Sequence, residues 1–339
     1  MTDYTILGSG VIGLYTAYLL LERGIDSKKI KIIAKHTPGD LSHHFASPFA
    51  GATVPCVKND DEDIQFFCKF TFENLGKIRQ QLGGNCGIET IWNNEFWYKK
   101  PSEKTLKKFY SYIFEYKEIP KAQIPKGQAY GLRYKTWAFN APLFIQRLSD
   151  YIKAKGVKVD VREISDLKEV KTKGDTIIFN CTGFGSRFIK GIEDLDVIPI
   201  RAQVVVVEAP SVVETHLSWG NNVETYAIKR PKSNELVLGG FYQHDNWNKD
   251  VLGKETQDIL QRVSKEFPQI IPSGKTIYDF PIKREISAFR PSRKSGVRIE
   301  KELIDGRLVI HNYGAGGTGY AQGLGMAEQA VRLIPSSKL

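Results

Sequence analysis

With 339 residues, the chain is long enough for one large domain or two medium ones, each with its own hydrophobic core. Its 41% hydrophobic and 25% charged residues are those of an ordinary soluble protein, and no apolar run is long enough to predict a membrane span. The net charge of +10 comes from scattered Lys and Arg residues without interleaved aromatic residues, a distribution that argues against a nucleic-acid partner.

The first predicted elements are a strand over residues 4–7 and a helix over residues 11–23. Gly8, Gly10 and Gly13 have the spacing G-x-G-x-x-G, and a second apolar strand follows over residues 31–34. In such a unit the first glycine permits a tight turn, the second lets a pyrophosphate approach the backbone, and the third lets the helix pack closely on the sheet. The helix N-terminus then faces the phosphate charge. This context predicts a dinucleotide-binding site rather than an ordinary glycine turn.

The end of the second strand departs from the usual dinucleotide motif. An acidic residue normally stands there and binds the adenosine ribose, whereas this chain has Lys35 followed by His36. Two cations would suit a cofactor with a 2′-phosphate. The N-terminal segment therefore leaves FAD, NAD and NADP open.

The segment from residue 38 to residue 139 shows no clear catalytic motif. His43 and His44 are adjacent in a predicted loop, without a Cys or acidic partner nearby, so we expect no metal site. The dense aromatic residues of this segment indicate a hydrophobic core. Its predicted elements are a helix, a strand and a second helix, at residues 60–82, 91–98 and 103–116.

A second strand-and-turn signal indicates that the nucleotide-binding sheet resumes later in the chain. A helix over residues 142–156 and a strand over residues 157–161 precede an apolar strand at 176–180, which leads into Cys181-Thr182-Gly183. The dinucleotide-binding domain is therefore discontinuous. After it come strands without intervening helices, which predict an antiparallel sheet, at residues 201–208, 224–228 and 235–240.

The C-terminal third ends in a third glycine-rich turn. A helix over residues 254–267 and a strand over 282–289 lead to Arg290-Pro291-Ser292-Arg293. An apolar strand from Leu308 then reaches a glycine-rich turn at 313–319, and a helix follows over residues 323–334. Such a turn can place backbone amides against the anionic edge of a ring.

The cysteines and the last three residues indicate the compartment. Four cysteines, at positions 56, 68, 86 and 181, are too far apart for a metal or redox motif and too few for a disulfide framework, which suits a reducing compartment. Ser337-Lys338-Leu339 matches the tripeptide that the peroxisomal import receptor reads. We therefore expect the peroxisomal matrix and this receptor as a partner.

Taken together, six motifs resemble the D-amino-acid oxidase family, in that family's order and over nearly the whole chain, with the yeast members as the most similar. They are Val11-Ile12-Gly13-Leu14, Ala46-Ser47-Pro48-Phe49-Ala50-Gly51, Asn180-Cys181-Thr182-Gly183, Gly239-Gly240 through Asn246-Trp247, Arg290-Pro291-Ser292-Arg293 and residues 311–327. The resemblance implies FAD as cofactor. It also implies oxidation of D-amino acids by O2, with hydride transfer from Cα to flavin N5, giving 2-oxo acid, ammonia and hydrogen peroxide.

The resemblance also assigns site residues. Arg290 would pair with the substrate carboxylate, Tyr226 would donate a hydrogen bond to the same group, and the Gly317 carbonyl would accept one from the amino group. Such a guanidinium fork can fix Cα without a catalytic base. The residues expected at the cofactor are Gly8, Gly10, Val11, Ile12, Gly13, Lys35, His36, Ser42, Gly51, Ile164, Cys181, Thr182, Gly183, Gly314, Gly316, Gly317, Gly319, Tyr320 and Ala321.

We therefore expect an α/β protein with a discontinuous, Rossmann-like FAD-binding domain and a largely antiparallel substrate domain, the site lying between them. The FAD-binding domain would comprise residues 1–58, 140–198 and 286–339, and the substrate domain residues 59–139 and 199–285.

The side chain of the substrate stays open. Residues 220–223 lack a second pocket tyrosine of the mammalian enzymes, and no aromatic residue follows Gly51, so the lid is expected to be different or short. Neutral D-amino acids are the first expectation. D-Aspartate is the second, with Lys229, Arg230 and His244 as candidate cations. A flavin-binding module without turnover is the alternative from another class, and a homodimer is left open.

Overall fold

The computed structural model describes residues 2–54, 61–172, 174–220 and 224–338. The chain divides into two units. Unit 1 comprises Met1–Ala50, Pro142–Ile200 and Phe289–Leu339, and unit 2 comprises Gly51–Ala141 and Arg201–Ala288. The sequence predicted domain boundaries near residues 58, 140, 198 and 286. That one domain binds FAD and the other binds the substrate stays a prediction.

Unit 1 is built around a mainly parallel sheet, sheet A, with the order β14-β15-β7-β1-β2-β6. Its neighbours are parallel except for the pair β14–β15, which is antiparallel. The strands are β1 (Asp3–Leu7), β2 (Ile30–Ala34), β6 (Lys158–Val161), β7 (Thr176–Asn180), β14 (Arg298–Ile304) and β15 (Arg307–Tyr313). The short, apolar central strands fit a sheet that is covered on both faces.

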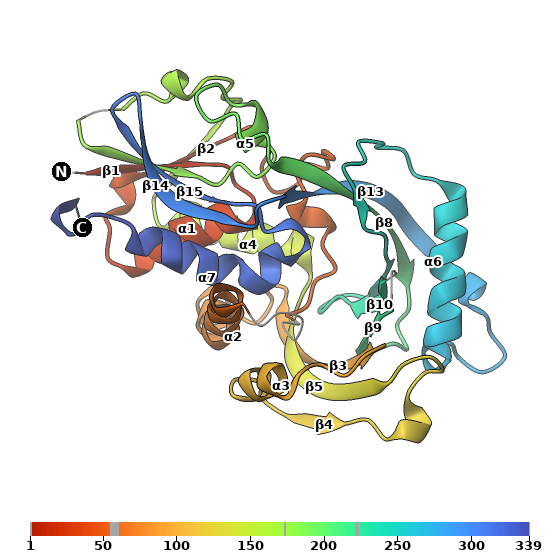
Figure 1. Cartoon of the computed structure of the whole chain (residues 1–339). Coiled ribbons are helices and arrows are strands. Elements are labelled where there is room, and N and C mark those ends of the chain that lie inside the picture. Colours follow the sequence, from red (N-terminus) through yellow and green to blue (C-terminus); the bar gives the residue numbers. More distant parts are fainter. Residues whose placement is uncertain (1, 55–60, 173, 221–223, 339) are drawn as a thin grey trace. The chain divides into compact units, whose positions relative to one another are not determined.

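Two helices, α1 (Val11–Glu22) and α7 (Gly319–Arg332), lie side by side in unit 1 (Figure 1). Their approach is close because Gly323 has no side chain: a methyl group there would lie 3.3 Å from atoms of Ile12 and Tyr15. Unit 1 also contains α5 (Gly185–Phe188), and α4 (Ala141–Ala154) enters it at Pro142. One hydrophobic cluster joins sheet A to the loops on either side of β7. Its members from the sheet are Leu7, Ile33, Ile178 and Val309, and its members from the loops are Leu167, Val170 and Ile189.

Unit 2 is built around sheet B, with the order β12-β8-β11-β10-β9-β3-β5-β4, and β13 pairs with β8. The predicted antiparallel arrangement is correct for β8, β11 and β10. The structure adds β9, which is antiparallel to β10 and parallel to β3. Its strands are β3 (Ile88–Trp97), β4 (Tyr116–Glu118), β5 (Tyr130–Phe139), β8 (Val197–Glu208), β9 (Thr215–Trp219), β10 (Glu224–Lys229), β11 (Glu235–Gly239), β12 (Gln243–His244) and β13 (Ile282–Arg293), with β8 and β13 crossing into unit 1.

The two faces of sheet B carry separate hydrophobic clusters. On one face, Ala227 and Leu236 pack with Ile259 and Val263 of α6 (Gly253–Glu266), the helix drawn beside this sheet in Figure 1. On the other face, Tyr226 and Ile228 pack with residues that include Val204, Leu217 and Val237. The alternation along β10 therefore decides which side chains share a face.

The aromatic residues before residue 140 form a core, as expected. Phe72, Phe109 and Tyr134 are buried and make ring contacts with Tyr112 or with one another. They lie on or beside α2 (Glu62–Leu82), α3 (Glu103–Tyr110) and β5. The predicted helix 103–116 is too long, because β4 begins at Tyr116, whose ring stacks on Tyr110 with centroids 4.0 Å apart.

Other elements differ from the sequence predictions in extent. The structure adds β5, β9, β12 and β14, extends β13 through Pro291, and starts α7 at Gly319 rather than at residue 323. Cys86 and Cys181 are buried thiols, whereas Cys68 is disulfide-bonded, which the cysteine pattern did not predict. Cys56 lies outside the described residues. In the part of the chain that the structure describes, no helix has the length and hydropathy needed to cross a membrane.

Candidate active site

The turn between β1 and α1 can be built only from glycines at two positions. Gly8 has a φ of +102°, and a methyl group there would lie 2.5 Å from the carbonyl oxygen of Cys181. A methyl group at Gly13 would overlap the carbonyl oxygen of Gly8. The first and third glycines of the motif thus bring β1, α1 and the turn after β7 into direct backbone contact.

The N-terminus of α1 is available to an anion. Its N-cap residue, Gly10, makes no side-chain cap, and the first turn contains no acidic residue. The Val11 amide donates to Ser47 Oγ at 3.0 Å, and Leu14 makes the first bond back to Gly10. The amides of Ile12 and Gly13 have no acceptor within the helix, as is general for the first turn. They and the helix dipole can attract a phosphate.

The N-terminus of α7 lies beside that of α1. A methyl group at Gly319 would lie 3.6 Å from Val11 Cγ1, and both residues are the first of their helices. Like α1, α7 has no side-chain cap and no acidic residue in its first turn. The short helix over Gly316–Thr318 leads into it. Two uncapped helix starts therefore meet in unit 1, a donor set that suits the pyrophosphate and ring edge of FAD.

The end of β2 carries acidic groups that the sequence analysis missed. Lys35 Nζ lies 2.8 Å from Glu163 Oε1, because Ala34 of β2 pairs with Val161 of β6. His36 Nδ1 lies 2.5 Å from Asp40 Oδ2, and Ser42 N donates to Asp40 Oδ1 at 2.8 Å.

Burial raises the pKa of Asp40, but the hydrogen bonds from His36 and the Ser42 amide outweigh it, so the pKa lies below its usual value. Carboxylates of the kind that bind ribose hydroxyls are therefore present near Lys35 and His36.

The turn after β7 forms another wall of this region. The Cys181 amide donates to Leu7 O at 2.9 Å, and Thr182 donates to Asn180 Oδ1 from its amide and its hydroxyl, at 3.2 and 2.7 Å. Gly183 has a φ of +55°, and a methyl group there would lie 3.4 Å from Pro291. Burial raises the pKa of the Cys181 thiol to about 12, so Cys181 is not a thiolate nucleophile at neutral pH.

Arg290 and Gly317 come from two segments that one bridge joins. Ser292 of β13 pairs with Ala315 in an antiparallel bridge, and a methyl group at Gly316 would lie 2.5 Å from Ser292 Oγ. Arg290 precedes Ser292 by two residues, and Gly317 follows Ala315 by two. Gly317 lies in the short 3-10 helix Gly316–Thr318 that begins directly after the bridge, so the strand register ends at Ala315. The structure thus joins the segments that carry these two residues, and their roles as substrate contacts stay a prediction.

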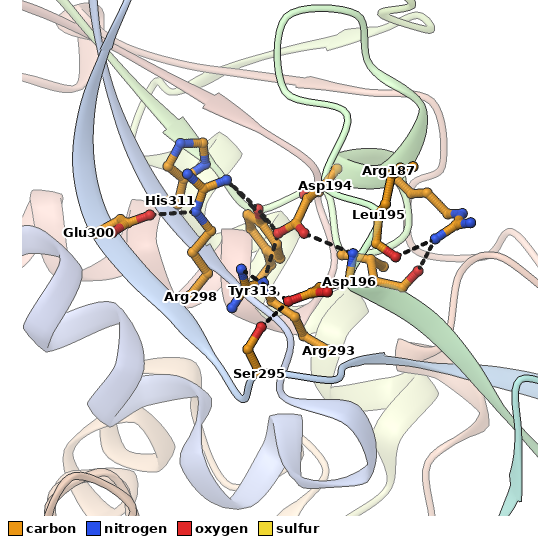
Figure 2. A network of polar contacts seen from close by, with 12 residues as sticks. Arg187, Asp194, Leu195, Asp196, Arg293, Ser295, Arg298, Glu300, His311 and Tyr313 are labelled. Carbon is orange, nitrogen blue, oxygen red and sulfur yellow. Dashed lines mark hydrogen bonds and ion pairs between the residues drawn. The ribbon is translucent and has the colours of Figure 1, made fainter.

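Arg293 and Arg298 are held in an ion-pair network (Figure 2). Arg293 Nε and the Tyr313 hydroxyl each donate to Asp194 Oδ2 at 2.7 Å. Arg298 donates to Tyr313 and, from Nε and Nη2, to the carboxylates of Glu300 and Glu302. Because carboxylates of unit 1 already engage both guanidinium groups, neither is a good candidate for the substrate anchor.

In unit 2, the predicted substrate contact Tyr226 lies on β10 and is 9% exposed. Methyl groups at Gly239 or Gly240 would overlap its phenol ring or hydroxyl. Gly239 faces Tyr226 directly in the antiparallel pair β10–β11. The glycine pair that the sequence analysis noted as a motif therefore provides the space for this side chain.

The three candidate cations for an acidic substrate are placed differently. Lys229 shares a strand face with Ala227, opposite to the face of Tyr226, and burial lowers the pKa of its ammonium group. Arg230 is 1% exposed and donates to Glu235 Oε2 at 2.8 Å. His244 is exposed on β12. Residues 221–223 of the expected lid lie outside the described residues.

The remaining predicted cofactor residues divide between the units. Ile164 packs with the cluster that contains Leu7 and Ile33, and the Tyr320 hydroxyl donates to Ser47 O at 2.8 Å. Ala321 is buried in α7, and Gly314 has a φ of +91°. Gly51 belongs to unit 2, where a methyl group would lie 2.6 Å from Ile228 Cδ1, so the structure does not place it with the others. Within the described ranges, His, Cys, Asp and Glu form no metal-binding group of three.

Comparisons with known proteins agree with this architecture. The model of the family "FAD dependent oxidoreductase" matches residues 3–333. D-Amino-acid oxidase from Schizosaccharomyces pombe is 37% identical over 345 aligned residues, which cover 99% of this chain and 97% of the relative. D-Aspartate oxidase 1 from Caenorhabditis elegans is 27% identical, over 98% of this chain and 96% of the relative.

Solved structures share the fold at low sequence identity. Glycine oxidase from Geobacillus kaustophilus has a TM-score of 0.74 at 15% identity, covering 98% of this chain and 94% of that one. L-Proline dehydrogenase from P. horikoshii has a TM-score of 0.75 at 14% identity, covering 100% of this chain and 94% of that one. These similarities show the fold class that the sequence predicts.

Proposed function

Because the chain belongs to the FAD-dependent oxidoreductase family, whose model matches residues 3–333, we propose that it is a D-amino-acid oxidase. The observation that carries this proposal is the similarity to the Schizosaccharomyces pombe oxidase, at 37% identity over 99% of the chain. The reaction converts a D-amino acid, O2 and water into a 2-oxo acid, ammonia and hydrogen peroxide.

The residues of unit 1 fit FAD. The glycines at positions 8 and 13 form a cradle that any side chain would fill, and two uncapped helix starts lie beside it. The Ile12 and Gly13 amides would bind the pyrophosphate, and the turn Cys181-Thr182-Gly183 would contact the cofactor. Glu163 and Asp40 are the acidic groups that could serve the ribose in place of the residue that Lys35 replaces. When bound, FAD supplies the two-electron acceptor for the oxidation of Cα–H.

Three residues hold and orient the substrate in this proposal. Arg290 grips the carboxylate with its planar fork, Tyr226 donates a hydrogen bond to the same group, and the Gly317 carbonyl accepts one from the amino group. The bridge between Ser292 and Ala315 joins the segments that carry Arg290 and Gly317, which supports this assignment. The protein's contribution to rate is then the fixed orientation of Cα.

Neutral D-amino acids are the proposed substrates. Lys229 is on the opposite face of the sheet from Tyr226, and Arg230 is already paired with Glu235. An acidic substrate side chain would need a fixed cation, because an unpaired carboxylate in a dry pocket is costly. The position of the two residues therefore favours alanine-like substrates over D-aspartate.

We also propose that the protein is imported into peroxisomes through Ser337-Lys338-Leu339, with the import receptor as its partner. Leu339 lies outside the described residues. The oligomeric state, including a homodimer, stays a prediction that size-exclusion chromatography with light scattering would decide.

The direct test is anaerobic titration of the purified protein with D-alanine, L-alanine and D-aspartate. We expect a yellow protein that bleaches with D-alanine, recovers its colour in air with release of peroxide, and does not bleach with L-alanine. Preferential bleaching by D-aspartate would support the acidic substrate class. A yellow protein that no amino acid bleaches would be a binding module, and a colourless protein that binds a nicotinamide cofactor would refute the FAD proposal.

A further inference from the structure

A chain of buried polar side chains connects the turn after β7 to the hairpin formed by β14 and β15. Asn180 of β7 and His311 of β15 are paired in the parallel register, and both are fully buried. Asn180 Nδ2 lies 3.2 Å from His311 Nδ1, and His311 Nε2 lies 3.0 Å from Glu302 Oε2. Figure 2 shows His311 beside Arg298 and Tyr313.

The contacts of Asn180 fix which way its amide is oriented. Asn180 Oδ1 accepts from Thr182 N and Thr182 Oγ1, and it also lies 3.4 Å from the Ser186 hydroxyl. Its Nδ2 therefore points toward His311 and toward Ser186 Oγ, the latter at 3.1 Å. Any other orientation would set an amide N–H against the Thr182 amide N–H.

This orientation also fixes the proton of the imidazole. An amide nitrogen only donates, so His311 Nδ1 must accept, and the one proton of a neutral imidazole must be on Nε2. The Nε2–H group can then donate to Glu302. If His311 also carried a proton on Nδ1, two N–H groups would face each other, one from His311 and one from Asn180 Nδ2. The Asn180 amide would then have to rotate and lose its contacts with Thr182.

We propose that His311, as the neutral tautomer protonated on Nε2, is a positioning residue for the cofactor: it holds Asn180, and through Asn180 the turn Cys181-Thr182-Gly183, in the shape that binds FAD. The inference rests on the proposed FAD site, because it assumes that this turn contacts the cofactor. It assigns to two buried residues a role that none of the sequence motifs predicted.

Burial favours the neutral form of His311 near neutral pH. Burial is the largest cause that lowers the pKa of His311, and Arg298 adds to it, while Glu302 and Glu300 oppose it. Asn180 on β7 does not titrate. The charged or titratable groups that contact or act on His311 are Arg298, Glu300 and Glu302 of β14 and Tyr313 of β15, and Tyr313 in turn binds Asp194.

Two substitutions test the role of each ring nitrogen of His311 by itself. His311→Asn places an amide oxygen near the position of Nδ1 and can still accept from Asn180. His311→Gln reaches toward Glu302 but removes that acceptor. We expect His311→Gln to raise the Kd of FAD about tenfold or more, because a buried donor loses its partner, whereas His311→Asn stays within about threefold of the parent. Free FAD is measured by fluorescence after dilution of the full-length holoenzyme.

The matched control is Glu302→Gln, which keeps an acceptor for His311 Nε2–H and lies at a half-exposed position. It should bind FAD like the parent. A purely structural role would instead lower the melting temperature of the FAD-free protein in His311→Gln without changing the Kd of FAD. That result, or equal FAD binding by His311→Gln and the parent, would overturn the proposal.

A pH titration tests the same proposal on the unmodified protein, in case a variant does not fold. The Kd of FAD should be constant above the ordinary pKa of histidine and rise at lower pH, while circular dichroism shows the protein still folded. The His311→Asn variant still contains His36, His43 and His44, which can also titrate near the cofactor. Its Kd of FAD should therefore rise less at low pH than that of the parent, and the difference is the contribution of His311. An unchanged pH profile in His311→Asn would contradict the role of His311. Failure of the proposed function looks different: the parent would bind no FAD or oxidise no D-amino acid.

Discussion

At the scale of single residues, several glycines are required by what lies next to them. Gly8 and Gly13 permit backbone-to-backbone contact, whereas Gly239 and Gly240 make room for the Tyr226 phenol. These are different physical requirements, although all four appear in the sequence as glycine motifs. The arginines near the C-terminus differ in a similar way, because Arg293 and Arg298 are engaged by carboxylates while Arg290 lies on the strand that bridges to the glycine turn.

The substrate role of Arg290 predicts a large loss of catalysis on substitution. Truncating one partner of a buried, hydrogen-bonded charge pair costs about 2–5 kcal/mol. At about 1.4 kcal/mol per tenfold change, Arg290→Ala should lower kcat/KM for D-alanine by roughly 30- to 4,000-fold. Arg290→Lys should recover only part of it, because an ammonium group cannot reproduce the fork. Steady-state peroxide assays measure both.

The control for this prediction is Arg284→Ala on the same strand. Arg284 is half exposed and pairs with Glu235, so its removal should leave kcat/KM nearly unchanged. FAD content should stay near that of the parent in both Arg290 variants. Near-parental turnover in Arg290→Ala would exclude Arg290 as the carboxylate anchor.

His216 gives a residue-level prediction about pH. It is 7% exposed on β9, with its ring 5.5 Å from that of Phe267, and burial lowers its pKa to about 4, although Glu214 opposes the shift. Below the ordinary pKa of 6.5 the unfolded chain therefore binds a proton that the folded chain does not, so stability falls as pH falls toward 4. Between pH 7 and pH 5 the expected loss from this group is about 2 kcal/mol.

Urea unfolding at pH 7 and pH 5 measures this loss. All 5 tryptophans belong to unit 2, so their fluorescence reports on the unit that contains His216. His216→Gln should lose less stability at pH 5 than the parent does, by about 2 kcal/mol. The exposed His244→Gln should behave like the parent. An equal pH dependence in His216→Gln and the parent would mean that other groups cause the acid sensitivity.

At the scale of elements, the starts of α1 and α7 form the anion-binding part of unit 1. Neither N-cap residue makes a side-chain cap, neither first turn has an acidic residue, and a methyl group at Gly319 would lie 3.6 Å from Val11 Cγ1. The positive ends of two helix dipoles thus act on the same region. Helix α6 also starts without a side-chain cap, but Glu255 stands in its first turn.

The start of α1 can be tested with Gly10→Ala. A methyl group at Gly10 would lie 3.2 Å from Ser47 Oγ and would occupy the approach of the pyrophosphate. We expect the Kd of FAD to rise by roughly tenfold or more, equivalent to about 1.4 kcal/mol, with little change in the melting temperature of the FAD-free protein. Gly13→Ala, which overlaps the Gly8 carbonyl, should destabilise the fold itself.

Gly253→Ala, at the start of α6, is the matched control because a methyl group there meets open space. It should affect neither FAD binding nor stability noticeably. If Gly10→Ala bound FAD as tightly as this control does, the pyrophosphate would not approach the backbone at that glycine.

At the scale of the whole molecule, the C-terminal tail is attached to unit 1. The Tyr4 hydroxyl donates to Lys338 O at 2.5 Å, and Lys338 Nζ lies 3.3 Å from Asp175. Lys338 therefore contacts residues of unit 1 through both its backbone and its side chain. The ion pair involves a largely exposed Asp175, and such pairs contribute at most about 1 kcal/mol.

Removal of Ser337, Lys338 and Leu339 should leave activity intact and lower the melting temperature only slightly. In cells, a tagged protein without the tripeptide should move from peroxisomes to the cytosol, as fluorescence microscopy would show. Tyr4→Phe is the control: it removes the contact but keeps the tripeptide, so it should still be imported. Import of the trimmed protein would place the address elsewhere in the chain.

The sequence alone predicted the parts of the fold that depend on short-range chemistry. The β1–α1–β2 unit, the turn after residue 180 and the glycine-rich C-terminal turn were found because each needs particular residues at fixed spacing. The antiparallel strands from residue 201 were found because alternation and the lack of helices are local features. Helix α3 was predicted too long because the pairing of β4 with β5, rather than helix propensity, decides the conformation after Tyr110.

What only the tertiary structure decided is which residues meet across the sheets. Glu163 reaches Lys35 because β6 lies beside β2, and His311 reaches Asn180 because β15 lies beside β7, although 131 positions separate them in sequence. Lys229 and Tyr226 are three residues apart, yet strand alternation puts them on opposite faces. Such partners have no signal in a single sequence, because strand order and register follow from packing the whole sheet and not from any local pattern.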